Sequence, residues 1–250
     1  MSTAAPTRPA FAGIVRAEAL KAARSRSLVL LAWFSLVLCA LTAFGYAQLG
    51  ADDAARTTDD VIRAWMMTTL FAALFGAILV GREFDSRVIS RAVLLSGTRE
   101  RLLTAKILVV VGSGIAFGLL AVVGAVVSAV LMPSWTGGET LWTAEATATT
   151  VGVFVSTVLA AAWGGAIALV VRHQLGAALI VVGFTLLIDP VVQRIWPEGA
   201  NALFTISLSS LYRDPKPELL SAPWAALVAL AWIAVLFVAG RALYQRRDLP

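Results

Sequence analysis

The sequence predicts an all-α, polytopic membrane protein with six transmembrane helices. Hydrophobic residues make up 59% of the 250 residues and charged residues only 14%, where soluble domains carry about 25%. The mean hydropathy is +0.84. A soluble globule of this size could not hide so much apolar surface, since over half of a folded protein's exposed area is apolar already. The composition also excludes a disordered chain, a collagen-like repeat and a disulfide framework.

Six apolar runs between charges have about the length needed to cross a bilayer, which takes about 20 mostly apolar residues. They cover residues 28–49, 64–81, 107–132, 146–171, 175–188 and 219–240. The fifth run is short, and it spans only if Asp189 lies at the headgroups and the helix continues to about Val192. For this run alone, a buried helix of a soluble protein is the alternative. We therefore divide the chain into a cytoplasmic N-terminal segment, 1–27, and a six-helix transmembrane domain, 28–250.

The basic residues predict the orientation. With the N-terminus inside, 15 of the 20 Lys and Arg residues lie on the cytoplasmic side, as the positive-inside rule requires. We therefore expect a multi-pass protein of the cell membrane with both termini in the cytoplasm. A net charge of +5 would suggest nucleic-acid binding in a soluble protein. Here the orientation accounts for the charge, and the expected surroundings are the lipid bilayer, with no nucleic-acid partner.

The N-terminal segment contains a predicted amphipathic helix over residues 11–26, lying on the membrane surface. Its apolar residues share one face, and they are Phe11, Ile14, Val15, Ala19 and Ala22. Most of the basic residues lie elsewhere, namely Arg16, Lys21, Arg24 and Arg26. Glu18 falls within the apolar arc, and the alternative is a basic tail that only fixes the topology.

The outer loop, 189–218, is predicted to hold short re-entrant helices between spans five and six. It contains four prolines, and its piece 202–211 is rich in leucine, isoleucine and phenylalanine. An exposed loop would not need these side chains. Because unpaired backbone is not tolerated against lipid, we expect this piece to pack on protein.

Catalytic motifs are mostly absent from the sequence. One histidine, His173, and one distant cysteine, Cys39, cannot build a zinc site. There is no phosphate-binding loop and no nucleophile elbow. No charge lies deep in an apolar run, so a proton relay is not indicated. Gly114 and Gly118 form a Gly-x-x-x-Gly in the third run, for which helix packing is the ordinary explanation.

One acidic cluster leaves an enzymatic alternative open. It consists of Asp52, Asp53, Asp59 and Asp60, on the predicted outer side. Paired aspartates can hold Mg²⁺ against a diphosphate, which would make the chain a membrane enzyme acting on a lipid phosphate. The ordinary interpretation is a solvated loop whose last two aspartates precede a helix, where its dipole favours carboxylates.

The cytoplasmic loop 82–106 is the most informative segment. Val88, Ala92 and Leu95 repeat at helical spacing, and Ser96-Gly97 ends that pattern. Thr98 is placed to cap the next helix, which runs into the third span. The sequence therefore predicts a short amphipathic helix between two spans, able to press into a groove on a soluble partner.

These residues resemble the ABC-2 permease family, the membrane subunits of type-2 ABC exporters. Glu83 matches the glutamate of that family's loop, and Leu102-Leu103-Thr104-Ala105-Lys106 matches its Leu-Leu-x-Ala-Lys ending. Ser96-Gly97-Thr98-Arg99 stands where Pro-x-x-Arg is usual, without the proline, and Asp85-Ser86-Arg87 replaces Gly-Thr. Glu18 and Lys21 match the Glu-x-x-Lys that often ends the N-terminal helix.

The resemblance implies a permease subunit of an ABC exporter that moves substrate across the cytoplasmic membrane. ATP and Mg would be bound and hydrolysed by a separate ATPase subunit, so this chain is expected to be no enzyme and to hold no cofactor. The ATPase would bind beneath residues 85–101. A second copy or a paralogue would complete a dimer. The implied coupling residues are Glu83, Asp85, Arg87, Arg91, Thr98 and Arg99, and the implied connector-helix residues are Arg16, Glu18 and Lys21.

Two further points stay open at this stage. A structural or sensor membrane protein without a motor is a third class, which an adjacent gene for an ATPase with a Walker motif would argue against. The apolar spans suit a hydrophobic drug, a peptide or a lipid-like molecule as substrate.

Overall fold

The computed structural model describes residues 10–50, 53–85 and 98–246. Within these ranges the regular structure is entirely helical. The elements are α1 (Phe11–Ala23), α2 (Arg26–Leu49), α3 (Ala54–Arg63), the 3₁₀ turn η1 (Ala64–Met67), α4 (Thr68–Asp85), α6 (Arg99–Thr136), α7 (Ala144–Val171), α8 (Gln174–Gly183), the π-helical turn η2 (Phe184–Ile188), α9 (Asp189–Ile195), α10 (Pro197–Ala200), α11 (Phe204–Leu211) and α12 (Ala222–Arg246).

Six helical stretches in the described part of the chain are long and apolar enough to cross a membrane, as predicted. They are Arg26–Leu49, Ala54–Asp85, Arg99–Thr136, Ala144–Val171, Gln174–Ile195 and Ala222–Gln245. The second and third are much longer than the apolar runs in them. The third has 38 residues, or about 57 Å at 1.5 Å per residue. It begins where Thr98 accepts a hydrogen bond from the Arg101 amide, as expected of a cap.

The fifth span continues through Asp189 to Ile195, beyond the predicted limit near Val192. Pro190 has no amide hydrogen to donate within a helix, and the chain widens into the π turn just before it. A π turn takes in an extra residue. It therefore turns Asp189 inward, to 4% exposure, while Ile188 faces out at 39%. The side chain of Asp189 is therefore buried in the protein, and its position at the level of the headgroups stays a prediction.

Helix α7 is the centre of the bundle. In the most apolar, membrane-spanning stretch of α7, 67% of the residues are buried, against 17% in that of α2 and 11% in that of α12. Glycines let α4 and α7 approach closely: a Cβ on Gly76 would lie 2.2 Å from the Ala161 carbonyl oxygen, and one on Gly164 would lie 1.9 Å from that of Ala73. Gly114 and Gly118 of α6 pack on α7 in the same way, as the packing interpretation of their motif expects.

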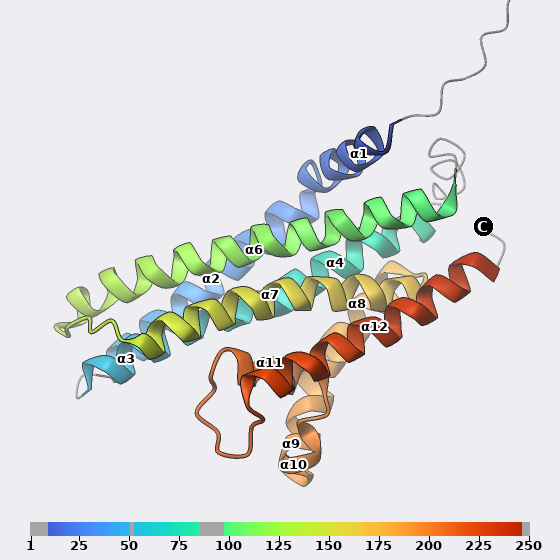
Figure 1. The fold of residues 1–250 in the computed structure, drawn as a ribbon. Coiled ribbons are helices and arrows are strands. Elements are labelled where there is room, and N and C mark those ends of the chain that lie inside the picture. Colours follow the sequence, from blue (N-terminus) through green and yellow to red (C-terminus); the bar gives the residue numbers. More distant parts are fainter. Residues whose placement is uncertain (1–9, 51–52, 86–97, 247–250) are drawn as a thin grey trace, which may run out of the picture.

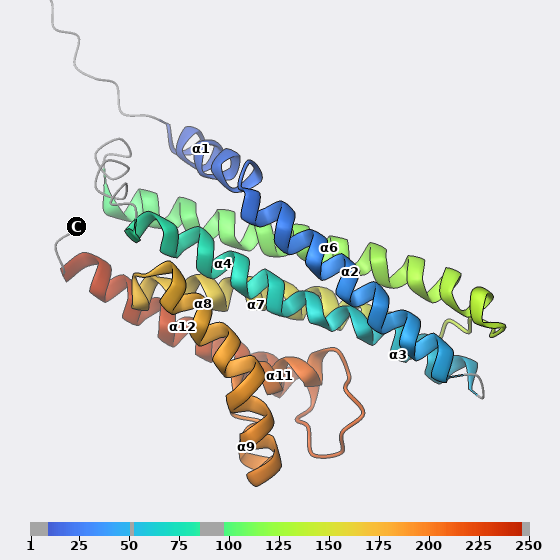
Figure 2. The same cartoon turned by 180° about the vertical axis from the view of Figure 1, so that it is seen from behind.

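The helices form two faces around this centre. Figure 1 shows α6, α7 and α12 in front, with α7 in the middle, and both neighbours pack on it. Figure 2 shows α2, α4 and α8 on the opposite face, with α9 diverging from the bundle. The start of α1, the end of α4, the start of α6 and the end of α12 all lie at one end of the bundle, which we call the coupling end (Figure 1). A chain that crosses the membrane six times has both termini, and the connection between its second and third spans, on the same side. That the coupling end is cytoplasmic stays a prediction from the basic residues.

The predicted outer loop folds into α9, α10 and α11. Helix α11 packs against α7 and α12, and Phe204, Ile206 and Leu208 are buried as expected. Trp163 of α7 stacks on Phe204 with ring centroids 4.6 Å apart. This packing accounts for the apolar side chains of the loop, and their re-entry into the membrane stays a prediction.

Candidate functional site at the coupling end

Four charged side chains from three helices meet at the coupling end. Lys106 of α6 contacts Glu18 of α1 at 2.8 Å and Glu83 of α4 at 2.5 Å. Lys21 of α1 contacts the same two carboxylates, at 2.5 Å and 3.4 Å. We call this group the ion cluster. Two cations and two anions cancel, so the cluster joins α1, α4 and α6 without net charge.

Most of the ion cluster is removed from water. The side chains of Lys106 and Glu18 are each 7% exposed and that of Glu83 is 13% exposed, whereas Lys21 is half-exposed. Burial raises the pKa of Glu18, but Lys106 and then Lys21 outweigh it, so that pKa lies below its ordinary value. Burial likewise lowers the pKa of Lys21, but Glu18 and Glu83 reverse the effect and raise it. Each buried charge depends on its partners, because an unpaired one would be strongly destabilising.

The local sequence of α1 explains why Glu18 reaches this position. Ile14, Glu18 and Ala22 are spaced four residues apart and form the buried stripe of the helix. This stripe packs on α6. Phe11 and Ala19, which share the predicted apolar face, are exposed on the protein, and their contact with the membrane surface stays a prediction. Glu18, which interrupts that face in the sequence, is buried because Lys106 provides its counter-charge.

A second set of contacts ties the start of α6 to the end of α12. The Arg99 guanidinium donates hydrogen bonds to the Tyr244 and Gln245 carbonyl oxygens, each at 3.2 Å. The next residue, Glu100, pairs with Arg241 at 3.2 Å and accepts a hydrogen bond from the Gln245 side chain. We call these five residues the α6–α12 clasp. The last carbonyls of a helix carry partial negative charge, so a cation there is stabilising.

Asp85, the last residue of α4, connects the second span to the turn between spans four and five. Its carboxylate accepts a hydrogen bond from the Gln174 amide at 2.9 Å, at the start of α8. His173 Nε2 lies 3.7 Å from it. The neighbouring Phe84 packs edge-on against Tyr244, with Arg172 5.1 Å from its ring centre. Both ends of the predicted coupling segment are thus held by contacts with other helices.

The predicted site residues fall into four groups. Glu18, Lys21 and Glu83 come together in the ion cluster, whereas Asp85, Thr98 and Arg99 hold the adjoining helix ends. Arg16 is exposed on α1. Arg87 and Arg91, and the predicted helix that carries them, lie outside the described residues.

Sequence reasoning missed several participants in these contacts, among them Lys106 and Arg241. Lys106 enters the sequence argument only as a motif ending, yet it is the centre of the ion cluster. Arg241 enters it only as one of the basic residues that fix the orientation. A lysine directly before a long apolar run was the available sign for Lys106, because such a charge needs a partner once the helix packs.

Two of the outer aspartates serve as a helix cap and as a local ion-pair partner. Asp53 accepts a hydrogen bond from the Arg56 amide at 3.1 Å and caps α3. Asp60 pairs with Arg63 one turn away. Asp59 and Asp60 lie inside α3 and do not precede a helix, because the second span begins ten residues earlier than its apolar run. Asp52 lies outside the described residues.

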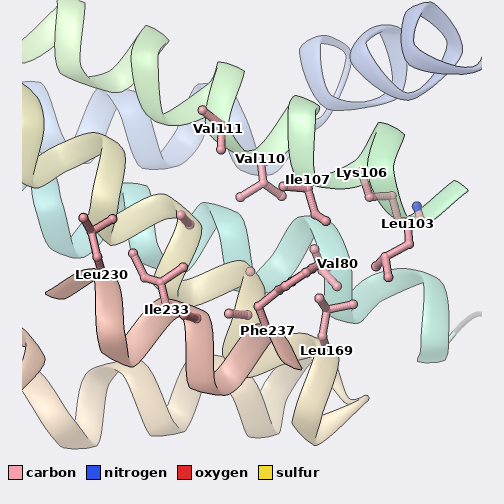
Figure 3. A pocket seen from close by; sticks show the side chains of 14 residues that line it. Val80, Leu103, Lys106, Ile107, Val110, Val111, Leu169, Leu230, Ile233 and Phe237 are labelled. Atoms are coloured by element: carbon pink, nitrogen blue, oxygen red, sulfur yellow. The ribbon is translucent and has the colours of Figure 1, made fainter. Parts of the chain in front are cut away.

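A cavity of about 480 Å³ has Lys106 of the ion cluster in its lining, and Figure 3 shows the side chains around it. Its lining comes from four helices and consists of Val80, Leu103, Lys106, Ile107, Val110, Val111, Ala162, Gly165, Ala166, Leu169, Leu230, Ile233, Ala234 and Phe237. Lys106 is the one charged residue among them. Its size lies within the range of small-molecule sites.

Comparison with known proteins identifies the family. A family model described as "ABC-2 family transporter protein" matches residues 14–188, more than two thirds of the chain. A search of curated proteins found no match. The matched residues include most of α1, the ion cluster, the first four spans and most of the fifth. The chain therefore belongs to the ABC-2 transporter family and is a multi-pass membrane permease of an ABC transporter.

Proposed function

We propose that the chain is the permease subunit of an exporter driven by a separate ATPase, which binds at the coupling end beneath residues 85–101. The observation that carries this proposal is the ion cluster. It joins α1 to the two helices that flank this segment, through Glu83 on one side and Lys106 on the other. A partner that moves the segment therefore acts on three helices at once.

The mechanism follows from how the segment is anchored. On one side, Asp85 is bonded to the start of α8. On the other side, Thr98 caps α6, and Arg99 is bonded to the end of α12. Nucleotide closure of the ATPase would displace the segment, and these contacts would pass the motion to spans two, three, five and six. ATP and Mg supply the free energy in the partner, and the residues of this chain only transmit it.

The dimer and the cargo complete the proposal. A second copy or a paralogue would supply the other half of a two-fold assembly. The substrate path would form between the two halves and carry an apolar drug, peptide or lipid-like molecule outward. The apolar character of the spans supports this class of cargo.

The test is co-purification with a candidate ATPase encoded by a neighbouring gene. Replacing Arg87 and Arg91 by Glu should reduce co-purification and transport-linked ATP hydrolysis while membrane insertion persists, because the change reverses two charges of the segment proposed to contact the ATPase. The matched control replaces Arg56 and Arg213, at the opposite end, by Glu, and should co-purify as the wild type does. Unchanged co-purification of the Arg87→Glu/Arg91→Glu variant would contradict the assignment.

The enzymatic alternative is tested separately. Replacing Asp52, Asp53, Asp59 and Asp60 by Asn would abolish turnover of a lipid phosphate by an enzyme that uses them. We expect this variant to transport nearly as the wild type does. A purified single chain that turns over a lipid phosphate unaided, and loses this activity in the variant, would overturn the transporter proposal.

A further inference from the structure

The cavity at the coupling end is a groove between α6 and α12 with α7 as its floor. Floor residues such as Gly165 and Ala166 are small and buried. The walls are Ile107 and Val111 of α6 and Ile233 and Phe237 of α12, which are only half-buried (Figure 3). Small residues below and large residues on both sides leave space for an elongated apolar group.

The residues around the groove indicate that it opens toward the lipid bilayer. On α6, Leu108 and Ile115 are exposed next to the wall residues, and on α12, Leu230, Val235 and Val238 are exposed. These side chains belong to spans three and six, so the outer sides of both walls face hydrocarbon. A molecule entering from this side comes from the bilayer and carries a hydrocarbon chain.

The coupling end of the groove has a different character. Arg241 lies one helical turn beyond Phe237 and therefore on the same face of α12. Arg99 lies one turn before Leu103 on α6, and Glu100 is the acid between these two cations. Arg241 is half-exposed despite its pair with Glu100. An apolar groove that ends at a half-exposed arginine matches a molecule with a hydrocarbon chain and an anionic head.

We propose that this groove is a binding site for an anionic phospholipid of the adjacent leaflet, with one acyl chain along α7 and the phosphate at Arg241. The acyl chain would supply the van der Waals contacts that the side chains lining the cavity do not make with one another. The phosphate gains a charge-assisted hydrogen bond from a guanidinium suited to it. The site depends on the fold of this chain alone and needs no ATPase.

The experiment uses the full chain in phosphatidylcholine nanodiscs doped with phosphatidylglycerol that carries a photoactivatable acyl chain. Peptides labelled after irradiation are identified by mass spectrometry. We expect labelling to concentrate on residues 103–111 and 230–237, and to exceed that by phosphatidylcholine with the same photoactivatable chain. Ala234→Phe, at an exposed position of the wall, should fill the groove and remove this preference without straining the core. Arg241→Gln should lower the phosphatidylglycerol preference about fivefold, since one arginine near a membrane surface contributes about 1 kcal/mol.

The control is Leu119→Phe, an exposed position of α6 outside the groove, which should leave the labelling unchanged. Labelling spread evenly over the exposed faces of the spans, or unchanged by Ala234→Phe, would overturn the proposal. Cross-links from groove residues to a second copy of the chain would also overturn it, since they would make the occupant another protomer. None of these outcomes depends on whether an ATPase binds.

Discussion

The two ends of the bundle use charge in different ways. At the coupling end, Glu18 and Lys106 are 88 residues apart in the chain, and their side chains are buried against each other. At the opposite end, Asp60 pairs with Arg63 one turn away, and Arg213 meets Glu145 at 3.5 Å with both side chains about half-exposed. Exposed pairs contribute little, whereas a buried charge holds its partner firmly once both are out of water. Among the described residues, the buried ion pairs that join different helices therefore lie at the coupling end.

Removing the central cation should give the largest effect. Lys106→Met leaves Glu18 and Glu83 buried without their main counter-charge, which should destabilise the folded chain by about 3–5 kcal/mol. The matched control is Lys21→Met, which removes a half-exposed cation from the same cluster and should cost less than about 1 kcal/mol. Reversible denaturation in detergent measures both. Equal losses for the two variants would show that burial does not distinguish the lysines.

The seam between α4 and α7 gives an uncharged comparison. A Cβ at Gly76 would lie 2.2 Å from the Ala161 carbonyl oxygen, whereas at Gly112 of α6 it would meet nothing within 4 Å. Gly76→Ala should therefore destabilise by about 1–3 kcal/mol through overpacking. Gly112→Ala should be neutral or stabilising by up to about 1 kcal/mol. Thermal unfolding of both variants in the same detergent tests the seam, and a neutral Gly76→Ala would mean that the two helices are farther apart.

Acid pH should weaken the ion cluster, with a smaller effect than the substitutions above. The pKa of Glu18 is lowered in the folded state. Its stabilising contribution to the docking of α1 is therefore fully present above the ordinary carboxyl pKa, and it is lost as the pH falls through the pKa of the folded state. The raised pKa of Lys21 preserves its contribution until strongly alkaline pH. Docking of α1 should therefore be constant from about pH 5 to 10 and weaken below about pH 4.

Hydrogen exchange of the α1 amides, corrected for intrinsic rates, measures this dependence. Glu18→Gln removes the titrating group and should flatten the acid limb of the curve. An acid limb that persists in Glu18→Gln would assign it to another carboxyl.

The opposite end should give the smallest effect. Asp53→Ala removes the cap of α3 and should cost about 1 kcal/mol, while Asp53→Asn keeps a capping oxygen and should cost a few tenths. Denaturation in detergent compares the two. A loss as large as that of Lys106→Met would mean that the two ends are equally important to the fold.

The sequence predicted the fold at the level of helices but underestimated their lengths. Counting apolar residues between charges located all six spans, because lipid demands about 20 apolar residues in each. It missed the extensions, such as Ala54–Arg63 and residues 99–106, because a helix that leaves the hydrocarbon can continue in polar sequence. The π turn at Phe184–Ile188 was also hidden, although Pro190 marked the place where the helix had to widen.

The sequence predicted several residues of the site but not which residues they contact. Glu18, Lys21 and Glu83 were named from a resemblance, which says nothing of what each contacts. Glu18 counted against an amphipathic α1 when the helix was considered alone. It becomes favourable only when Lys106, 88 residues away, is brought beside it by the packing of α1 on α6. Long-range pairing of this kind depends on the tertiary fold, and local periodicity cannot reveal it.

The most direct test of the ion cluster measures the distance between α1 and α6. Spin labels at Ala17→Cys and Thr104→Cys, both exposed positions, in a Cys39→Ala background, report this distance by pulsed electron resonance. We predict one narrow distance distribution in the otherwise native chain and a broad one after Lys106→Met, with Lys21→Met close to the native result. A narrow distribution that Lys106→Met leaves unchanged would contradict the claim that buried charge fixes α1 to the helices beside the coupling segment.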